Sequence, residues 1–228
     1  MRHLRCFVLA AVAVALFTAP PAGAHPLNRE RPAAIFTPVE PAWLGESVAQ
    51  IDSLPVSENP FAGNGNPCLT VGHKVLQEIG SGPCRIEDGW TVMLGFGSGS
   101  ISAQDPFPQT QAQPCALTQA ADRATIAAAQ LTVDGTTTVN LYTSRFELCS
   151  PQVTLLLPED NIDDLPGPQL VTETGHGWFA AVRHLRPGRH SIVGDATLAD
   201  GTHFTVPATI IVVPRHAADS DTGHQPSR

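Results

Sequence analysis

Apolar and polar residues alternate along the last part of the chain, which is the pattern of strands that are buried on one face. Within residues 202–213, every second position is apolar: Phe204, Val206, Ala208, Ile210 and Val212. Pro207 lies in the same run and cannot donate a hydrogen bond to a neighbouring strand, so we expect an edge position or a bulge there. Shorter segments of similar character predict strands at 74–79, 90–96, 131–133, 139–142, 153–157, 169–174, 178–184 and 189–198.

Two other segments show the periodicity of helices. Residues 43–54 carry apolar side chains at helical spacing, namely Leu44, Val48, Ile51 and Leu54. Residues 115–130 are rich in alanine, contain neither Gly nor Pro, and place on one face Ala116, Ala120, Ala124 and Ala127. The preceding residues, 97–114, are dense in Gly, Ser, Gln and Pro and predict a long loop.

Short strands separated by Gly and Pro predict a mainly β protein, folded as an antiparallel sandwich with one Ala-rich helix. The chain has 21 Pro and 19 Gly among its 228 residues, which favours many turns over long helices. We expect four parts: a signal peptide at 1–24, a flexible leader at 25–42, the β-sandwich domain at 43–214 and a disordered tail at 215–228.

The first 24 residues have the layout of a secretory signal peptide. Arg2 and Arg5 give a basic start, an apolar run follows from Phe7 to Phe17, and residues 22–24 read Ala-Gly-Ala. The apolar run is shorter than the roughly 20 residues that a membrane-spanning helix needs. We therefore expect this segment to be cleaved off, the chain from His25 onward to be secreted, and no membrane association after cleavage.

The balance of charge argues against nucleic acid as a partner. The chain has 13 Lys and Arg against 21 Asp and Glu, a formal charge of −8, and loss of Arg2 and Arg5 with the signal leaves −10. Lys74 is the only lysine. An acidic surface repels phosphate backbones, so we expect no nucleic-acid binding.

Four cysteines remain after signal cleavage: Cys68, Cys84, Cys115 and Cys149. An even number in an exported chain predicts two disulfide bonds, for which three pairings exist. We favour Cys68–Cys84 and Cys115–Cys149, because each closes a short or moderate loop between neighbouring segments. A metal site is the alternative, but the sequence contains no CxxC or CxxH spacing that supports it.

Residues 185–192 read Leu-Arg-Pro-Gly-Arg-His-Ser-Ile, and Asp200-Gly201 follows them. Pro187 presets φ and Gly188 accepts a turn, after which alternate residues face a core. The segment resembles the closing hairpin of many immunoglobulin-like domains in bacterial exported proteins. This resemblance implies an immunoglobulin-like architecture for the sandwich and carries no function.

Between about Trp43 and Val213 the chain carries a series of further segments: Asn59-Pro60, Cys68 and Cys84, the helix from Cys115, Val133-Asp134-Gly135, Leu157-Pro158-Glu159-Asp160-Asn161, Gly177-Trp178 and Pro187-Gly188-Arg189-His190. The set is similar to that of a family of exported bacterial proteins without an assigned activity. Members of that family often have a cysteine where residues 97–100 stand here. The resemblance therefore implies that Cys149 is the replacement partner of Cys115.

His25 would be the first residue of the secreted chain. An N-terminal His can chelate copper through its amine and imidazole, as in lytic polysaccharide monooxygenases and periplasmic copper carriers. Such a site needs a second His held rigidly opposite the first, and a Pro-rich leader does not provide that rigidity. We expect adventitious metal binding here rather than a functional copper site.

Four more histidines concentrate in the last predicted strands: His176, His184, His190 and His203. Two of them could bind a metal if they lay opposite each other on paired strands, but no neighbouring Cys or carboxylate completes a ligand set. We expect structural roles instead. His190 is expected to hydrogen-bond the preceding turn, and His184 and His203 are expected to face water.

The carboxylates and aromatic rings give little indication of enzymatic chemistry. An acidic loop could offer oxygen ligands to Ca²⁺, but its spacing matches no calcium-loop pattern and Asp is common in turns; its acids are Glu159, Asp160, Asp163 and Asp164. No Gly-x-Ser-x-Gly elbow exists, and other acids are scattered: Asp105, Glu147 and Glu173. Trp90 and Trp178 lie in apolar strands and are expected in the core, which leaves few rings for carbohydrate binding.

The sequence therefore predicts a small secreted, non-catalytic β-sandwich domain without a cofactor, which presents loops to an extracellular protein or a cell-envelope component. A carbohydrate or cell-envelope binding module is the second hypothesis, and it predicts at least two aromatic side chains exposed on one face. A metal-dependent enzyme, or a copper-binding protein that uses His25, is the third. It predicts histidines that converge around a concavity.

Overall fold

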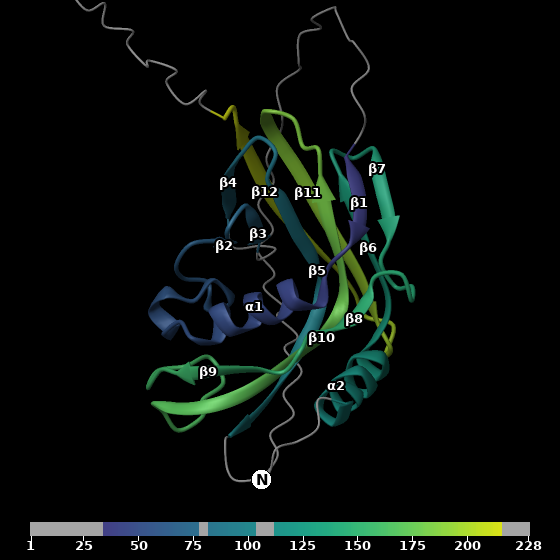
Figure 1. Ribbon diagram of the computed structural model, residues 1–228. Coiled ribbons are helices and arrows are strands. Elements are labelled where there is room, and N and C mark those ends of the chain that lie inside the picture. The colour runs from purple at the N-terminus through teal and green to yellow at the C-terminus, as the bar shows by residue number, and fades with distance from the viewer. Residues whose placement is uncertain (1–33, 78–81, 104–111, 216–228) are drawn as a thin grey trace, which may run out of the picture.

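The structure is a computed structural model that describes residues 34–77, 82–103 and 112–215, so the predicted signal peptide, half of the predicted leader (25–33) and most of the predicted tail lie outside it. The described residues form two β-sheets that pack face to face (Figure 1). Helix α1 (Pro41–Asp52) covers the outer face of the larger sheet, and helix α2 (Ala112–Thr125) packs against its inner face. The predicted mainly β sandwich is confirmed.

The larger sheet has seven strands, with the order β1-β10-β5-β3-β2 and with β8 and β9 also paired to β10. The long strand β10 pairs with β5 on one side and, in succession, with β9, β8 and β1 on the other. The strands are β1 (Ile35–Pro38), β2 (Cys68–Val71), β3 (Lys74–Gln77), β5 (Thr91–Ala103), β8 (Glu147–Cys149), β9 (Val153–Leu157) and β10 (Gln169–Arg183).

The smaller sheet has five strands in the order β4-β12-β11-β6-β7. They are β4 (Pro83–Glu87), β6 (Ile126–Val133), β7 (Thr137–Asn140), β11 (Gly188–Leu198) and β12 (His203–Val213). Asp134 and Gly135 both have positive φ, 52° and 65°, as the tight turn between β6 and β7 requires. Pro207 pairs only with β11, because β4 joins β12 from Thr209 onward, so the expected edge position is confirmed.

Both sheets are mixed rather than purely antiparallel. Strand β3 runs parallel to β5, and β4 runs parallel to β12. Parallel neighbours need a crossover connection, and a periodicity of two does not reveal which strand lies beside which. The remaining pairs are antiparallel, as expected.

The main core lies between the two sheets. It includes Leu94 of β5, Trp178 of β10, Leu131 of β6, Ile192 of β11 and Ile210 of β12, all of which are buried. Burial of a large aliphatic side chain contributes on the order of 1.5–3 kcal/mol, so these side chains hold the layers together. The alternation that predicted strand β12 is the alternation that fills this core.

Helix α1 matches the predicted helix at 43–54, shifted by two residues at each end. Pro41 suits the first turn, where its missing N–H would have no helical partner. Trp43, Leu44 and Ile51 pack against the outer face of the larger sheet, where they meet Met93 of β5.

The predicted helix at 115–130 is displaced. Helix α2 ends at Thr125, and residues 126–130 belong to β6, where Ile126 pairs with Leu198 of β11. The alanine face is exposed at Ala116, Ala120 and Ala124. The polar residues Thr118 and Asp122 are buried instead. Ile126 follows the helix with a β-branched side chain that the sheet core buries, which ends the helix early.

The predicted loop at 97–114 is wrong for residues 97–103, which continue β5. A Cβ at Gly97 would lie 2.2 Å from the carbonyl oxygen of His176, so only glycine permits this approach to β10. The ring of Phe179 covers the space that side chains on Gly95 and Gly97 would fill. Strand β10 likewise continues through 175–177, where the sequence predicts a break between two strands.

Both disulfide bonds join separate elements of the fold. Cys68–Cys84 connects β2 of the larger sheet to β4 of the smaller sheet, and Cys115–Cys149 connects α2 to β8. The favoured pairing is confirmed. Disulfides of this kind are typical of an oxidising compartment outside the cytoplasm. Among the described residues, no helix is long and apolar enough to cross a membrane.

Candidate functional site

Strand β10 carries two buried polar clusters, one on each of its faces. His176 points to the inner face beneath α2, and Glu173 points to the outer face beneath α1. Their exposed fractions are 1% and 2%. Buried polar groups destabilise a fold unless they are paired, so each cluster has to be explained by its partners.

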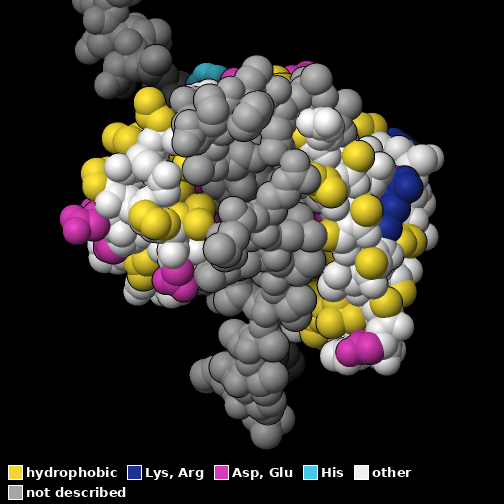
Figure 2. Space-filling model, turned by 90° about the horizontal axis from the view of Figure 1, so that it is seen from below, with side chains coloured by type: hydrophobic (Ala, Val, Ile, Leu, Met, Phe, Trp, Pro, Cys, Tyr) yellow, Lys and Arg dark blue, Asp and Glu magenta, His cyan; other side chains and the backbone are white. Residues whose placement is uncertain are grey.

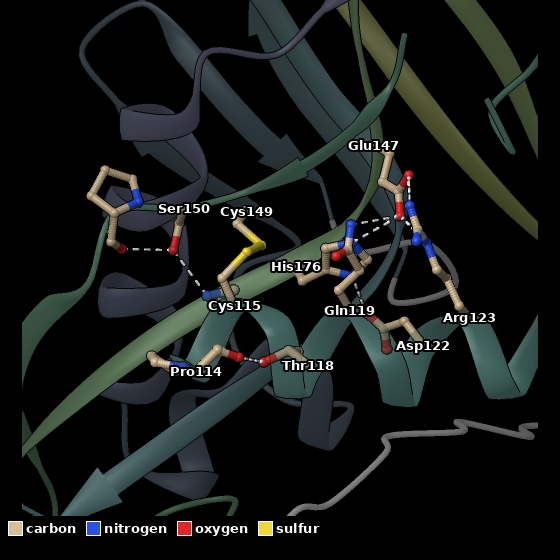
Figure 3. The surroundings of a disulfide bond; sticks show 12 residues. Pro114, Cys115, Thr118, Gln119, Asp122, Arg123, Glu147, Cys149, Ser150 and His176 are labelled. Carbon is tan, nitrogen blue, oxygen red and sulfur yellow. Dashed lines mark hydrogen bonds and ion pairs between the residues drawn. A yellow bond between two sulfur atoms is a disulfide. The ribbon is translucent and has the colours of Figure 1, made fainter. Parts of the chain in front are cut away.

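The His176 cluster draws together four elements of the fold. The imidazole Nδ1 lies 2.6 Å from Oδ2 of Asp122 on α2, and Nε2 lies 3.3 Å from Oε1 of Glu147 on β8. The hydroxyl of Ser98 on β5 donates to Oδ1 of Asp122 at 2.6 Å. Figure 3 shows the imidazole enclosed between the helix and the strand that carries Glu147. The cluster therefore fixes α2 on the sheet.

Glu147 is held by Arg123 and Gln119 as well as by the imidazole. Arg123 donates to it through Nε at 2.7 Å and Nη2 at 2.8 Å, and Gln119 donates at 3.3 Å (Figure 3). The hydrogen bond from Arg123 lowers the pKa of Glu147 below its ordinary value of 4.5, against the desolvation that raises it. The two ring nitrogens of His176 thus each contact a different carboxyl group, one on α2 and one on β8.

A disulfide closes the other side of the same cluster. Cys149 of β8 lies opposite His176 in the strand register and is bonded to Cys115 in the first turns of α2 (Figure 3). Beside it, Ser150 accepts a hydrogen bond from the backbone N–H of Gly175 at 2.9 Å. The imidazole is thereby shut off from solvent, and its side chain is 0% exposed.

The Glu173 cluster is built from like charges. Glu173 lies within hydrogen-bonding reach of Asp52, the last residue of α1. Desolvation is the main cause that raises the pKa of both carboxyl groups, and the nearby charges of Asp52 and Asp163 raise that of Glu173 further. A hydrogen bond between two carboxyl groups requires that one of them keeps its proton, and the raised pKa of Glu173 favours Glu173 as the donor.

A third feature lies at the end of the larger sheet, where β9 pairs with the start of β10. Leu156 and Leu170 face each other across the two strands, and their exposed fractions are 56% and 54%. Their neighbours Leu155, Leu157 and Val171 point to the opposite face and are buried. Within the described residues, β9 has no strand partner on its other edge.

The loop that joins β9 to β10 adds negative charge beside the two leucines. Glu159, Asp160 and Asp164 are exposed there, and Figure 2 shows acidic side chains next to apolar ones on this end of the molecule. Asn161 shapes the loop: its amide donates to the carbonyls of Pro158 and Leu165, both at 2.9 Å. Asp163 is buried, and it lies close enough to Glu173 for its charge to raise the pKa of that carboxyl group.

The structure separates the histidines that the sequence groups together. His190 meets the carbonyl of Arg186 at 2.8 Å and Asp134 at 2.7 Å, so its expected bond to the preceding turn is confirmed. His184 and His203 are exposed, as expected. His176 lies apart in its own buried cluster. His25 and Asp105 lie outside the described residues.

Two features of the described part of the chain bear on metal binding and carbohydrate binding. There, no group of three or more His, Cys, Asp or Glu side chains could hold a metal ion. The exposed large apolar side chains in that part are aliphatic: Ile35, Leu117, Leu156 and Leu170. Trp178 is buried as expected, while Trp90 and Phe96 are partly buried against the core.

Sequence reasoning missed both buried clusters. Glu147 and Glu173 read as scattered acids, yet Glu147 meets His176 and Glu173 meets Asp52 across long sequence separations. Asp122 sits on a helix face that looks solvent-exposed by composition. The one available signal was the polar sequence of residues 172–176 inside a strand, because a buried strand carries polar residues only where partners exist.

Comparison with known protein families, with curated proteins and with solved structures finds no match to this chain. The geometry of these three features is therefore the basis on which a function can be proposed.

Proposed function

We propose that this protein is an exported, non-catalytic domain that binds an extracellular protein through the end of the larger sheet, formed by β9, the loop 158–168 and the start of β10. The proposal includes secretion by the signal peptide at 1–24, the immunoglobulin-like kinship of the sandwich and membership of the family of exported bacterial proteins that its motifs resemble. The cross-strand pair of exposed leucines, Leu156 and Leu170, carries it.

The non-catalytic part of the proposal is supported by where the titratable groups point. A general acid or base must reach the proton that it transfers. His176 and Glu173 are buried and are bonded to other groups of the chain. Glu147 is held by Arg123 through two short hydrogen bonds. These groups stabilise the fold and do not face a substrate.

The binding part is supported by the character of strand β9. Its sequence, Val-Thr-Leu-Leu-Leu, has no charge, proline or glycine. An uncharged apolar edge strand is a template for pairing with another extended segment, and native proteins usually protect such edges. Addition of a strand from a partner would use the main chain of β9 for affinity and the two leucines for specificity.

The chemistry of the partner follows from the surrounding charge. The acids Glu159, Asp160 and Asp164 flank the leucine pair, so the fitting occupant is an extended peptide segment with apolar side chains and a basic end. The predicted leader does not reach. Its residues 25–33 span roughly 30 Å when fully extended, whereas Leu170 lies 13 positions along β10 from Arg183, the partner of Ile35, or about 43 Å.

The carbohydrate-binding alternative is not favoured by the same surface. Rings that stack on sugars must stand exposed on one face, whereas the exposed large apolar side chains in the described residues are Leu and Ile. Leucine side chains pack against other apolar side chains of proteins and give no stacking platform.

Synthetic strand-forming peptides can test the proposal. We expect a peptide that alternates Leu and Thr and ends in Lys-Lys to bind in fluorescence anisotropy, and to shift the NMR amide signals of 153–157. A peptide ending in Glu-Glu should bind at least tenfold more weakly. Replacing both leucines, Leu156→Thr with Leu170→Thr, should weaken binding at least tenfold, whereas Ile35→Thr, on β1 beside the far end of β10, should leave it unchanged.

Three results would contradict the proposal. They are absence of binding by the basic peptide, an equal loss in the Ile35→Thr variant, and signal changes confined to strands other than β9 and β10. Sedimentation of the free protein provides a further check. A dimer that dissociates in the double leucine variant would mean that a second copy of the chain covers this edge.

A further inference from the structure

The contact between Asp52 and Glu173 joins three parts of the fold. Asp52 ends α1, Glu173 lies on β10 opposite Val153 of β9, and Asp163 belongs to the loop after β9. The exposed fractions of the three acids are 7%, 2% and 6%. Three buried acids therefore meet where the helix, the long strand and the β9 end converge.

The contact between Asp52 and Glu173 has no basic partner: among the described residues, no Lys, Arg or His is a cause of the pKa shift of either carboxyl group. On the β5 side, Gly99 presents only backbone, and a Cβ there would lie 2.3 Å from Oε1 of Glu173. Oε2 of Glu173 has no donor partner in the described structure. If both carboxyls lost their protons, two negative charges would face each other without a counterion.

Helix α1 is held by packing and by this contact rather than by a covalent bond. The disulfides join β2 to β4 and α2 to β8. The buried face of α1 consists of side chains such as Trp43, Leu44 and Ile51. A helix attached in this way can open locally while the rest of the sandwich stays folded.

We propose that the carboxyl contact between Asp52 and Glu173 is a pH-sensitive device, which holds α1 and the β9 end on the larger sheet in acid and releases them as the pH rises. The proposal concerns the free protein and does not depend on a partner. It gives a function to the acid cluster, because a neutral Gln or a Leu in place of Glu173 would hold the helix at every pH.

The direction follows from proton linkage. In the closed state burial raises the pKa of both carboxyl groups, and Asp52 and Asp163 raise that of Glu173 further, while the hydrogen bond from Glu173 only partly offsets the rise for Asp52. In the open state the two groups ionise near their ordinary values of 3.8 and 4.5. Above those values the open state binds fewer protons, so each rise in pH favours opening. The effect ends once the pH passes the raised pKa of the closed state. It amounts to at most about tenfold per pH unit for each proton.

Hydrogen exchange measured on the secreted chain between pH 4 and 8 tests this device. Protection factors, which are corrected for the intrinsic pH dependence of exchange, should fall several-fold per pH unit in α1 and in 153–173. They should stay level in β11 and β12. The Glu173→Gln variant should reduce this dependence, and the double variant with Asp52→Asn should abolish it. Glu46→Gln, an exposed change on the same helix, should leave it as in the wild type.

An equal fall of protection in the wild type and the double variant would overturn the proposal, as would level protection of α1 in the wild type. Should Glu173→Gln fail to fold, Asp52→Asn alone gives the same reading, because it also removes one of the two acids. Circular dichroism of each variant at pH 5 shows that the helix and sheets are intact before exchange is measured.

Discussion

Both faces of strand β10 bury polar side chains, but the two faces stabilise them in opposite ways. On the inner face, Asp122 and Glu147 are hydrogen-bonded by His176, Ser98 and Arg123, and these bonds close the cluster on itself. On the outer face, Asp52 and Glu173 meet without a cation and rely on a shared proton. The inner cluster is therefore a clamp for α2, whereas the outer cluster makes the attachment of α1 depend on pH.

Removal of the imidazole should have the largest effect on this contrast. In the variant His176→Leu, Asp122 and Glu147 lose the imidazole that bonds both of them in a buried site, and we expect a loss of about 3–5 kcal/mol in the free energy of unfolding, because each buried polar group that loses its partner costs about 1–3 kcal/mol or more. Urea denaturation at pH 7 measures it. His203→Leu is the control, because its contact with Asp195 spans 3.9 Å and the ring is exposed. A loss below about 1 kcal/mol for His176→Leu would show that the cluster is not a clamp.

The hydroxyl of Ser98 gives a smaller and cleaner test. Ser98→Ala removes the donor that lies 2.6 Å from Oδ1 of Asp122, and we expect a loss of about 1.5–3 kcal/mol, as for hydrogen bonds to charged groups. Thr205→Val removes a hydroxyl at the same 2.6 Å distance from Asp195, but on the exposed surface. It should cost no more than about 0.5 kcal/mol. Equal losses would mean that burial adds nothing to the inner cluster.

The pH dependence of global stability should separate the two faces by sign. The pKa of Glu147 is lowered by Arg123, so its contribution to stability is present above about pH 4.5 and is lost as the pH falls through the lowered value. The pKa of Glu173 is raised, so its contribution is present in acid and is lost as the pH rises. Each slope is at most about 1.4 kcal/mol per pH unit.

Urea denaturation between pH 3 and 8 checks these slopes. The free energy by which the wild type is more stable than Glu147→Gln should shrink as the pH falls. The stability of the wild type relative to Glu173→Gln should decrease as the pH rises. Two differences with slopes of the same sign would contradict the contrast between the faces.

Much of the fold is predictable because its signals are local. A few neighbouring residues are enough to predict the conformation of three elements: the run from Phe204 to Val212, helix α1 and the turn at Asp134-Gly135. The cysteine pairing could also be predicted from the sequence, because the two disulfide bonds close short or moderate loops, with sequence separations of 16 and 34 residues. By contrast, glycines 97 and 99 predict a loop by local rules and belong to a long strand in the structure.

The candidate site was less predictable than the fold. Its pairs join residues that are far apart in the chain: His176 and Asp122 are separated by 54 positions, and Leu156 and Leu170 are neighbours only through the register of β9 and β10. Asp52 and Glu173 each look like ordinary surface acids. What brings them together is the docking of α1 on one face of β10.

The amino-acid sequence alone determined the class of the protein: a β-rich sandwich with a short N-terminal helix, two disulfide bonds and an acidic surface. Those features follow from periodicity, composition and loop length, which each segment carries by itself. Only the tertiary structure decided that β5 continues through its glycines, that α2 turns Asp122 inward, and which charges meet across β10. The physical reason is that burial and charge pairing depend on neighbours supplied by distant segments, and a linear pattern does not name those neighbours.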